Sequence, residues 1–86
     1  MNKLKNLKQK IIYRSNYRGT KEMDILLKSF VKSILYKLNH NDLNNLLSLI
    51  SIDDDNLYKF KNGLNTSIEI KNNKITKLFK DYDLSK

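Results

Sequence analysis

Hydrophobic residues recur every three or four positions through most of this chain, and that spacing is typical of amphipathic α-helices. Between residues 3 and 13, one such stripe consists of Leu4, Leu7 and Ile11. The longest stripe covers about five helical turns and consists of Met23, Leu26, Leu27, Phe30, Val31, Ile34, Leu35 and Leu38. Thr20 stands at the N-cap position of this second helix, so we expect the helix to begin directly after it.

Shorter stripes and capping residues predict two further helices. Asn39 is placed to cap a third helix, which carries Leu43, Leu46, Leu47 and Ile50. One residue of the polar run 53–56 is expected to cap a short fourth helix, which contains Leu57, Tyr58 and Phe60. Gly63 should end this fourth helix, because glycine readily accepts the left-handed conformation found after helix C-termini.

The segment 66–82 fits two structures. Residues 67–70 alternate like a strand, and Asn72 with Asn73 suits the turn of a hairpin. Thr66 and Glu69 instead match a capping box, and a helical apolar face would then hold Ile68, Ile75, Leu78, Phe79 and Tyr82. The helix is favoured, because a lone hairpin adds little stability to a helical domain. We therefore predict a single all-α domain over residues 1–86, a compact bundle of four to five short helices.

Composition narrows the function classes. The chain has 86 residues, a net charge of +8 and no cysteine, so it has no disulfide and no thiolate metal site. The positive charge suggests an acidic partner, but the chain is rich in Lys, Asn and Ile and lacks Ala and Pro, which is typical of AT-rich codon usage. We therefore interpret much of the positive charge as lysines that accumulated by mutational drift on solvent-exposed helix faces. No segment is apolar over the length of a bilayer, and we expect a cytoplasmic protein without a membrane partner.

The usual catalytic constellations are missing from the sequence. His40 is the only histidine, so the chain cannot supply a common zinc site. The three aspartates at 53–55 lack the ligand spacing of a calcium loop. No glycine-rich phosphate loop is present, and an enzyme is not expected. A small basic nucleic-acid-binding protein is the alternative, although no recognition-helix signature supports it.

The segment before the longest helix concentrates unusual residues. Arg14 and Arg18 are the only arginines in a chain that otherwise uses lysine, and Gly19 is one of two glycines. A guanidinium offers a planar set of donors that lysine cannot copy. Gly19 either joins two helices or lets a partner's backbone approach closely. Arg18 and Glu22 either pair with each other or present a donor and an acceptor for docking on another protein.

These residues resemble a known family. Tyr13-Arg14-Ser15 followed by Arg18-Gly19-x-x-Glu22-x-Asp24 is similar to the R-G-x-x-E segment of the succinate dehydrogenase assembly factors, the SdhE-like flavinylation factors. Asn41-Asp42-Leu43, Asp53-Asp54, Leu57, Phe60 and Gly63 continue the resemblance, which covers about residues 10–78. Some positions depart from the family pattern: Phe60 replaces a tryptophan, Asn56 an aspartate and Tyr17 a basic residue, and no proline follows Gly63.

The resemblance implies a function. Members of the family bind the flavoprotein subunit of succinate dehydrogenase and promote covalent attachment of FAD to a histidine of that subunit. A fumarate reductase subunit is a second candidate client, and a monomeric factor is expected. The FAD belongs to the client, so no cofactor or metal is expected on this chain. By resemblance, the centre of the docking face is Arg18, Gly19 and Glu22, with further contacts from Tyr13, Arg14, Asp24, Asp53 and Asp54; Tyr13 could equally pack on the bundle, and Asp53 could be a cap.

Overall fold

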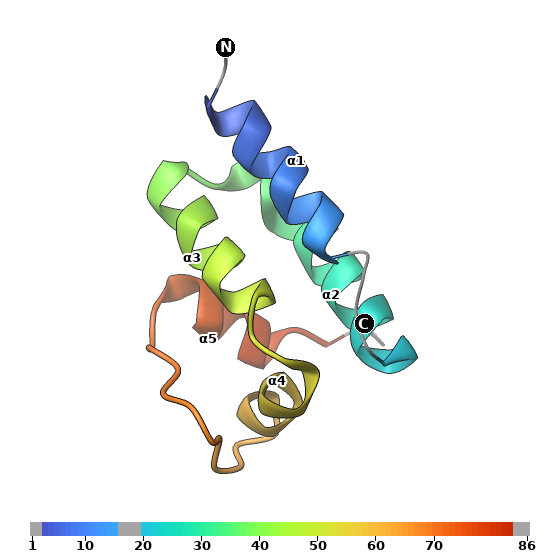
Figure 1. The fold of residues 1–86 in the computed structure, drawn as a ribbon. Helices are drawn as coiled ribbons and strands as arrows, with labels where there is room; N and C mark the ends of the chain where they lie inside the picture. The colour runs from blue at the N-terminus through green and yellow to red at the C-terminus, as the bar shows by residue number, and fades with distance from the viewer. Residues whose placement is uncertain (1–2, 16–19, 84–86) are drawn as a thin grey trace.

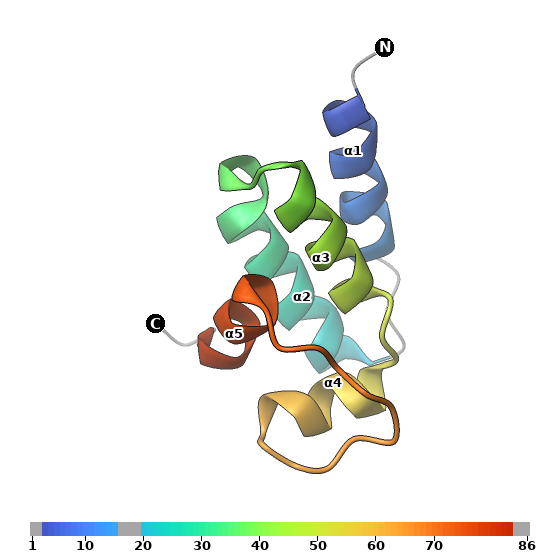
Figure 2. The same cartoon turned by 90° about the vertical axis from the view of Figure 1, so that its left-hand side faces the viewer.

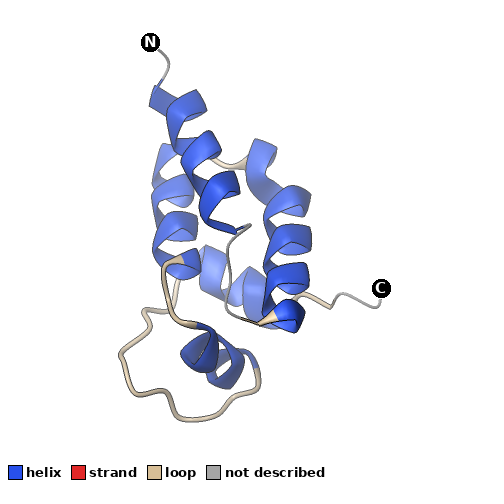
Figure 3. Ribbon diagram, turned by 45° about the vertical axis from the view of Figure 1, so that its right-hand side comes forward, coloured by secondary structure: helices blue, strands red, loops and turns tan. Residues whose placement is uncertain are grey.

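The computed structural model describes residues 3–15 and 20–83, and it contains five α-helices. They are α1 (Lys3–Ser15), α2 (Lys21–Ile34), α3 (His40–Ile50), α4 (Asp54–Lys61) and α5 (Lys74–Asp81), with a single 3₁₀ turn, η1 (Leu35–Lys37), after α2. Within these residues there is no β-strand (Figure 3). The predicted all-α bundle of four to five helices is thereby confirmed, with five.

The first three helices form the body of the bundle. Figure 1 shows α1 lying along both α2 and α3, and these helix pairs are in contact. The two short helices close one end: α5 packs against α3 and α4, and α4 lies near the start of α2 (Figure 2). The start of α2, the turn between α3 and α4, and α4 itself therefore lie together at that end.

The helix starts follow the capping residues that the sequence offers. The Thr20 hydroxyl accepts a hydrogen bond from the Met23 amide at 3.3 Å, and the Asn39 side chain accepts one from the Asp42 amide at 2.8 Å. Asp53 is the residue of the run 53–56 that caps α4. Such bonds satisfy backbone donors that have no partner inside the helix. The predicted starts of the second, third and fourth helices are confirmed.

Gly63 ends α4 as predicted, in a left-handed conformation with φ of 73°. The Gly63 amide donates to the Phe60 carbonyl at 3.2 Å, and the Leu64 amide donates to the Lys59 carbonyl at 2.8 Å. This pair of bonds is the Schellman arrangement, which satisfies the last carbonyls of a helix. The chain then leaves α4 in a new direction.

The core is continuous and draws on all five helices. Phe79 of α5 is fully buried, and its ring meets the Phe30 ring edge-on with the centroids 5.3 Å apart. The Tyr82 ring also packs against the Phe30 ring, with the same separation between the ring centroids. The buried apolar side chains are Ile11, Met23, Leu27, Phe30, Val31, Leu35, Leu38, Leu43, Leu46, Leu49, Ile50, Leu57, Ile75 and Phe79.

The second helix is shorter than its apolar stripe. It is α-helical only to Ile34 and tightens into η1, after which Leu38 is extended, with φ of −97° and ψ of 144°. Leu35 and Leu38 are nevertheless buried. The tighter turn lets both side chains reach the core while the backbone turns toward α3, a common use of 3₁₀ geometry at helix ends.

The start of the last helix differs from the prediction. α5 begins at Lys74, and residues 64–73 form a long loop, so neither the capping box at Thr66 nor the hairpin is correct (Figure 3). The actual capping box joins Asn73 and Thr76, whose side chains each bond the other's backbone amide. Ile68 and Leu78, expected on the apolar face, are 44% and 40% exposed. The loop is fixed elsewhere, by hydrogen bonds between Ser67 and the buried Asn56.

Candidate functional site

The predicted docking residues that the structure describes lie at the end of the bundle where α1 stops and α2 begins. Arg14 lies in the last turn of α1, and its Nη1 donates to the Ser51 hydroxyl at the end of α3, at 3.3 Å. Tyr13 is 65% exposed, so most of its ring faces solvent and it is not a core residue. Arg18 and Gly19, two of the three residues predicted to form the centre of the face, lie outside the described residues.

Thr20 joins the start of α2 to the start of α4. Its backbone amide donates to the Asp54 carboxylate at 2.8 Å, and its hydroxyl donates to the same oxygen at 3.2 Å. The Thr20 hydroxyl also caps α2. Asp54 is the first residue of α4, so one carboxylate and one threonine fix the relative position of the two helix starts. Of the predicted set, Asp54 and Glu22 are the two residues that this link brings to one place.

Glu22 of α2 and Tyr58 of α4 both line a groove between these two helices. The groove has a volume of about 390 Å³ and is lined by Thr20, Glu22, Met23, Asp54, Asp55 and Tyr58. It adjoins a second hollow of about 230 Å³, lined by Glu22, Met23, Leu26, Tyr58, Lys61 and Asn62. Glu22 is exposed, and Tyr58 is 59% exposed. The groove thus offers carboxylate acceptors beside an aromatic ring, over an apolar floor.

Tyr58 was not among the residues singled out from the sequence. It sits between Leu57, which is fully buried, and Lys59 in a helix of only eight residues. Its position in the apolar stripe suggested packing, whereas its ring is turned outward. A large exposed aromatic on a helix that flanks a groove is typical of binding surfaces.

Asp24 is less available to a partner than the resemblance suggested. Its side chain is 25% exposed, and one oxygen pairs with the Lys28 ammonium at 3.3 Å. The other oxygen, Oδ1, is buried and has no hydrogen-bond partner among the described residues. In the first turn of α2, Asp24 therefore combines a local ion pair with one buried oxygen that accepts no hydrogen bond from the described residues.

Asp53 has a structural role at this end of the bundle. Its carboxylate accepts the Asn56 amide at 3.1 Å, as the N-cap of α4, and the Asn56 side-chain nitrogen at 2.8 Å. The alternative prediction, that Asp53 caps a helix, is confirmed. Asp55, in the same turn, is exposed and pairs with Lys59 at 3.0 Å.

The described part of the site presents groups that are suited to recognition of another protein. Its functional groups are exposed acceptors, a phenol ring and the donors of Arg14. His40 is exposed at the start of α3, where its Nδ1 lies 3.2 Å from the Asn44 side-chain nitrogen. Within residues 3–15 and 20–83, no three His, Cys, Asp or Glu side chains are grouped closely enough to hold a metal ion. The same ranges contain no helix with the length and apolar character needed to cross a membrane.

Comparison with known proteins assigns the chain to a family. The family model described as "Flavinator of succinate dehydrogenase" matches residues 9–83. Neither the curated proteins nor the solved structures gave a match. The family match spans nearly the whole fold, from the middle of α1 to the end of α5, and includes every residue predicted to form the docking face. The chain therefore belongs to the Sdh5 family, the flavinators of succinate dehydrogenase.

Proposed function

We propose that this chain binds the flavoprotein subunit of succinate dehydrogenase, or the related subunit of a fumarate reductase, and promotes covalent attachment of FAD to it. The family match over residues 9–83 is the observation that carries this proposal. It favours the assembly function over the nucleic-acid alternative, which has only the net charge of +8 in its support.

The α2–α4 groove and the adjoining end of α1 form the proposed docking face. Glu22 contributes an exposed acceptor on one side of the groove, and Tyr58 contributes an exposed ring on the other. Exposed aromatic side chains and directional hydrogen bonds are what protein interfaces use for affinity and register. Arg18 and Gly19 complete the face by sequence, since they directly precede Thr20.

The factor would act by positioning. The FAD belongs to the client, and the bond to the flavin is made by the client's own histidine. A bound helper accelerates such a step when it holds the reacting parts in a productive arrangement, and correct geometry alone can supply a large share of a rate enhancement. The Thr20–Asp54 link joins the starts of α2 and α4, and a docking face built on two linked helix starts is suited to that task.

Co-expression tests the proposal. A flavoprotein subunit of succinate dehydrogenase is produced with and without this chain in cells that lack their own factor, and covalent flavin is measured as in-gel fluorescence after denaturation. We expect the chain to raise the covalent flavin per subunit. Equal flavin in both samples contradicts the proposal. A fumarate reductase subunit in the same assay identifies the preferred client.

Binding is measured separately from flavin attachment. Size-exclusion chromatography with light scattering on the purified chain, the client and their mixture gives the mass of each species. We expect a monomer alone and a one-to-one complex with the client. The cytoplasmic location stays a prediction, which fractionation of the producing cells can test.

A further inference from the structure

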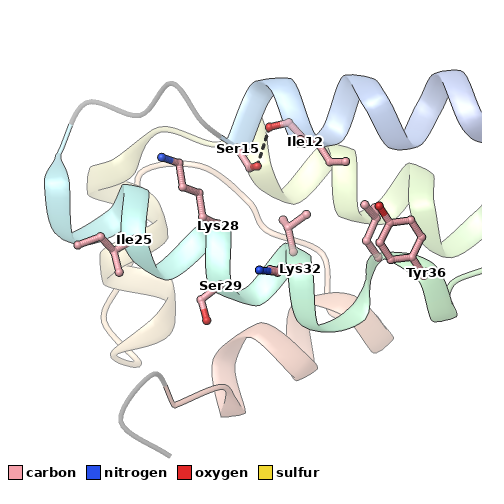
Figure 4. A pocket seen from close by; sticks show the side chains of 9 residues that line it. Ile12, Ser15, Ile25, Lys28, Ser29, Lys32 and Tyr36 are labelled. Carbon is pink, nitrogen blue, oxygen red and sulfur yellow. Dashed lines mark hydrogen bonds between the residues drawn. The ribbon is translucent and has the colours of Figure 1, made fainter.

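A second groove runs between α1 and α2 and shares no lining residue with the α2–α4 groove (Figure 4). Its volume is about 660 Å³. Val31 and Leu35 form its floor and are 2% and 1% exposed, whereas Ile12 of α1 and Ile25 of α2 stand on its walls and are 38% and 46% exposed. The groove thus has solvent-accessible apolar side chains on its walls and buried apolar side chains at its floor.

The charged side chains that line this groove in the described residues are lysines. Lys28 and Lys32 line it from α2, and Figure 4 shows both beside the apolar residues. At the far end, the Lys8 ammonium lies 5.3 Å from the centroid of the Tyr36 ring, which also lines the groove. Among the residues that the structure describes, no acidic side chain lines the groove. Lys28 is paired with Asp24, but no acidic side chain of the described ranges lies within salt-bridge distance of Lys32.

We propose that the α1–α2 groove binds an amphipathic helix of a partner protein, with apolar residues on one face and acidic residues beside them. Helix-in-groove recognition uses apolar anchors spaced three and four residues apart. From Ile25 to Tyr36 the groove follows α2 and η1 for about 16 Å, which accommodates about three turns of such a helix. Acidic residues flanking the anchors would meet Lys28, Lys32 and Lys8.

The shape and composition of the groove favour a peptide helix over other anionic partners. A membrane surface takes up apolar side chains that protrude from a helix face, whereas Val31 and Leu35 lie at the bottom of a hollow between two helices. Nucleic acid binding depends on many phosphate contacts, and this groove offers two lining lysines around an apolar floor. An apolar floor adds affinity only for a partner with its own apolar surface.

This inference is independent of the proposed function. It concerns a different set of residues, and the helix it predicts need not belong to the flavoprotein. If the unaltered chain binds no amphipathic acidic peptide at the α1–α2 groove but still supports normal flavin attachment, the inference alone is overturned. Absence of flavin stimulation with intact groove binding would overturn the proposed function alone.

The first experiment uses a designed probe. A fluorescent peptide of about four helical turns carries leucines spaced three and four residues apart, with glutamates flanking them. A control peptide has the same composition in scrambled order, and a second control replaces the glutamates with lysines. Fluorescence anisotropy is measured against the purified chain at physiological salt. We expect saturable binding of the amphipathic acidic peptide, with both controls at least about tenfold weaker.

Variants then locate the binding site. Lys32→Glu reverses a charge at the groove and places a carboxylate one turn from Lys28, a pairing that helices tolerate well. Lys77→Glu makes the same change on the exposed face of α5 and is the matched control. Ile25→Gln removes an apolar wall residue without adding charge. We expect Lys32→Glu and Ile25→Gln each to weaken peptide binding by at least about fivefold, and Lys77→Glu to leave it unchanged.

Amide chemical shifts supply a check that does not depend on the variants. On adding the peptide, the largest shift changes should fall on the residues of α1, α2 and η1 that line the groove, Ile12, Ile25, Ser29 and Tyr36 among them. Equal binding by scrambled and amphipathic peptides, or equal weakening by Lys77→Glu and Lys32→Glu, overturns the proposal. Tighter, groove-dependent binding to vesicles of anionic phospholipid or to duplex DNA than to the peptide also overturns it.

Discussion

The Asp54 carboxylate accepts two hydrogen bonds from Thr20, one from its backbone amide at 2.8 Å and one from its hydroxyl at 3.2 Å. The two residues are 34 positions apart in sequence. Thr20 precedes α2 and Asp54 begins α4, so this link sets how the two helix starts sit beside the α2–α4 groove. It connects the stability of that end of the bundle to the shape of the proposed docking face.

Replacing Asp54 should therefore destabilise the fold and distort the docking face. We expect Asp54→Ala to lower the free energy of unfolding by about 1–2 kcal/mol, because the Thr20 amide loses a charged acceptor. Denaturant unfolding followed by circular dichroism measures the change. Asp55→Ala is the matched control, since Asp55 lies in the same turn but makes only an exposed pair with Lys59, and its expected cost is at most about 0.5 kcal/mol. Equal costs for the two variants would show that the link contributes nothing.

Glu22 should matter for function and little for stability. Glu22→Gln removes an exposed negative charge from the α2–α4 groove, and we expect flavin attachment to the client to fall several-fold while unfolding changes by less than about 1 kcal/mol. Glu69→Gln makes the same change in the exposed loop before α5 and should leave flavin attachment at its normal level. If both variants behave alike in the co-expression assay, Glu22 is not part of the docking face.

Asn56 holds the long loop against α4. Its side-chain nitrogen donates to Asp53 at 2.8 Å and to the Ser67 hydroxyl at 3.0 Å, while its oxygen accepts the Ser67 amide at 2.8 Å. Asn56→Asp keeps the shape but loses the donor and places a second carboxylate beside Asp53. We expect it to cost about 1–3 kcal/mol in thermal or denaturant unfolding. An unchanged stability would mean that the loop is held by other contacts.

Gly63 should tolerate some side chains better than others. A Cβ built on Gly63 would meet no atom within 4 Å, so the cost of substitution comes from its positive φ and not from a clash. We expect Gly63→Ala to destabilise the protein by about 1 kcal/mol and Gly63→Asn by less, because asparagine visits the left-handed region more readily. Chemical denaturation of the three proteins gives the order. Alanine as stable as glycine would contradict the Schellman assignment.

Lys61 links α4 to the end of α5, and its titration should make the free energy of unfolding vary with pH in the alkaline range. Its ammonium donates to the Phe79 carbonyl at 2.8 Å and to the Tyr82 carbonyl. Burial lowers the pKa of Lys61 below its usual 10.5, and Asp83 and Asp81 partly oppose that shift. Between the lowered pKa and 10.5, the unfolded chain binds more protons than the folded protein, so this group's contribution to the free energy of unfolding rises with pH.

Comparison with Lys61→Met isolates that contribution. The free energies of unfolding of the parent and the variant are measured at neutral pH and at about pH 10. The parent minus variant difference should grow in favour of the parent as pH rises. A difference that shrinks with pH would mean that the carbonyl contacts keep the folded-state pKa above its usual value.

The elements that could be predicted from sequence are those set by local contacts. Asn39 and Thr20 cap helices through bonds to amides three positions on, and such bonds depend only on nearby residues. The start of α5 could not be predicted in this way, because Thr66 with Glu69 and Asn73 with Thr76 both resemble local capping signals. The observed start at Lys74 is consistent with a contact distant in sequence, in which the Ser67 amide bonds to Asn56 of α4.

The site shows the same division between local and distant contacts. Glu22 and Asp54 could be named from sequence, but not that Thr20 would bring them to one groove. Tyr58 was missed because its place in a short apolar stripe indicates packing, and its outward orientation depends on where α4 lies against α2. Arg14 was named, whereas its partner Ser51 carries no sequence signal. The sequence indicates which residue types stand at which positions of a helix. It does not indicate which residues of different helices lie next to each other.

The place of α5 in the core has a consequence for how the protein is made. Ile75 and Phe79 are fully buried in the core, and the Phe79 ring meets the Phe30 ring edge-on. During synthesis the chain emerges from its N-terminus, so α1 to α4 leave the ribosome before the residues that close the core. Until α5 arrives, Phe30 and its neighbours face water and are available to chaperones, proteases and other nascent chains. The fold is thus completed only once α5 has been synthesised, and premature stops anywhere before α5 should yield chains that are degraded.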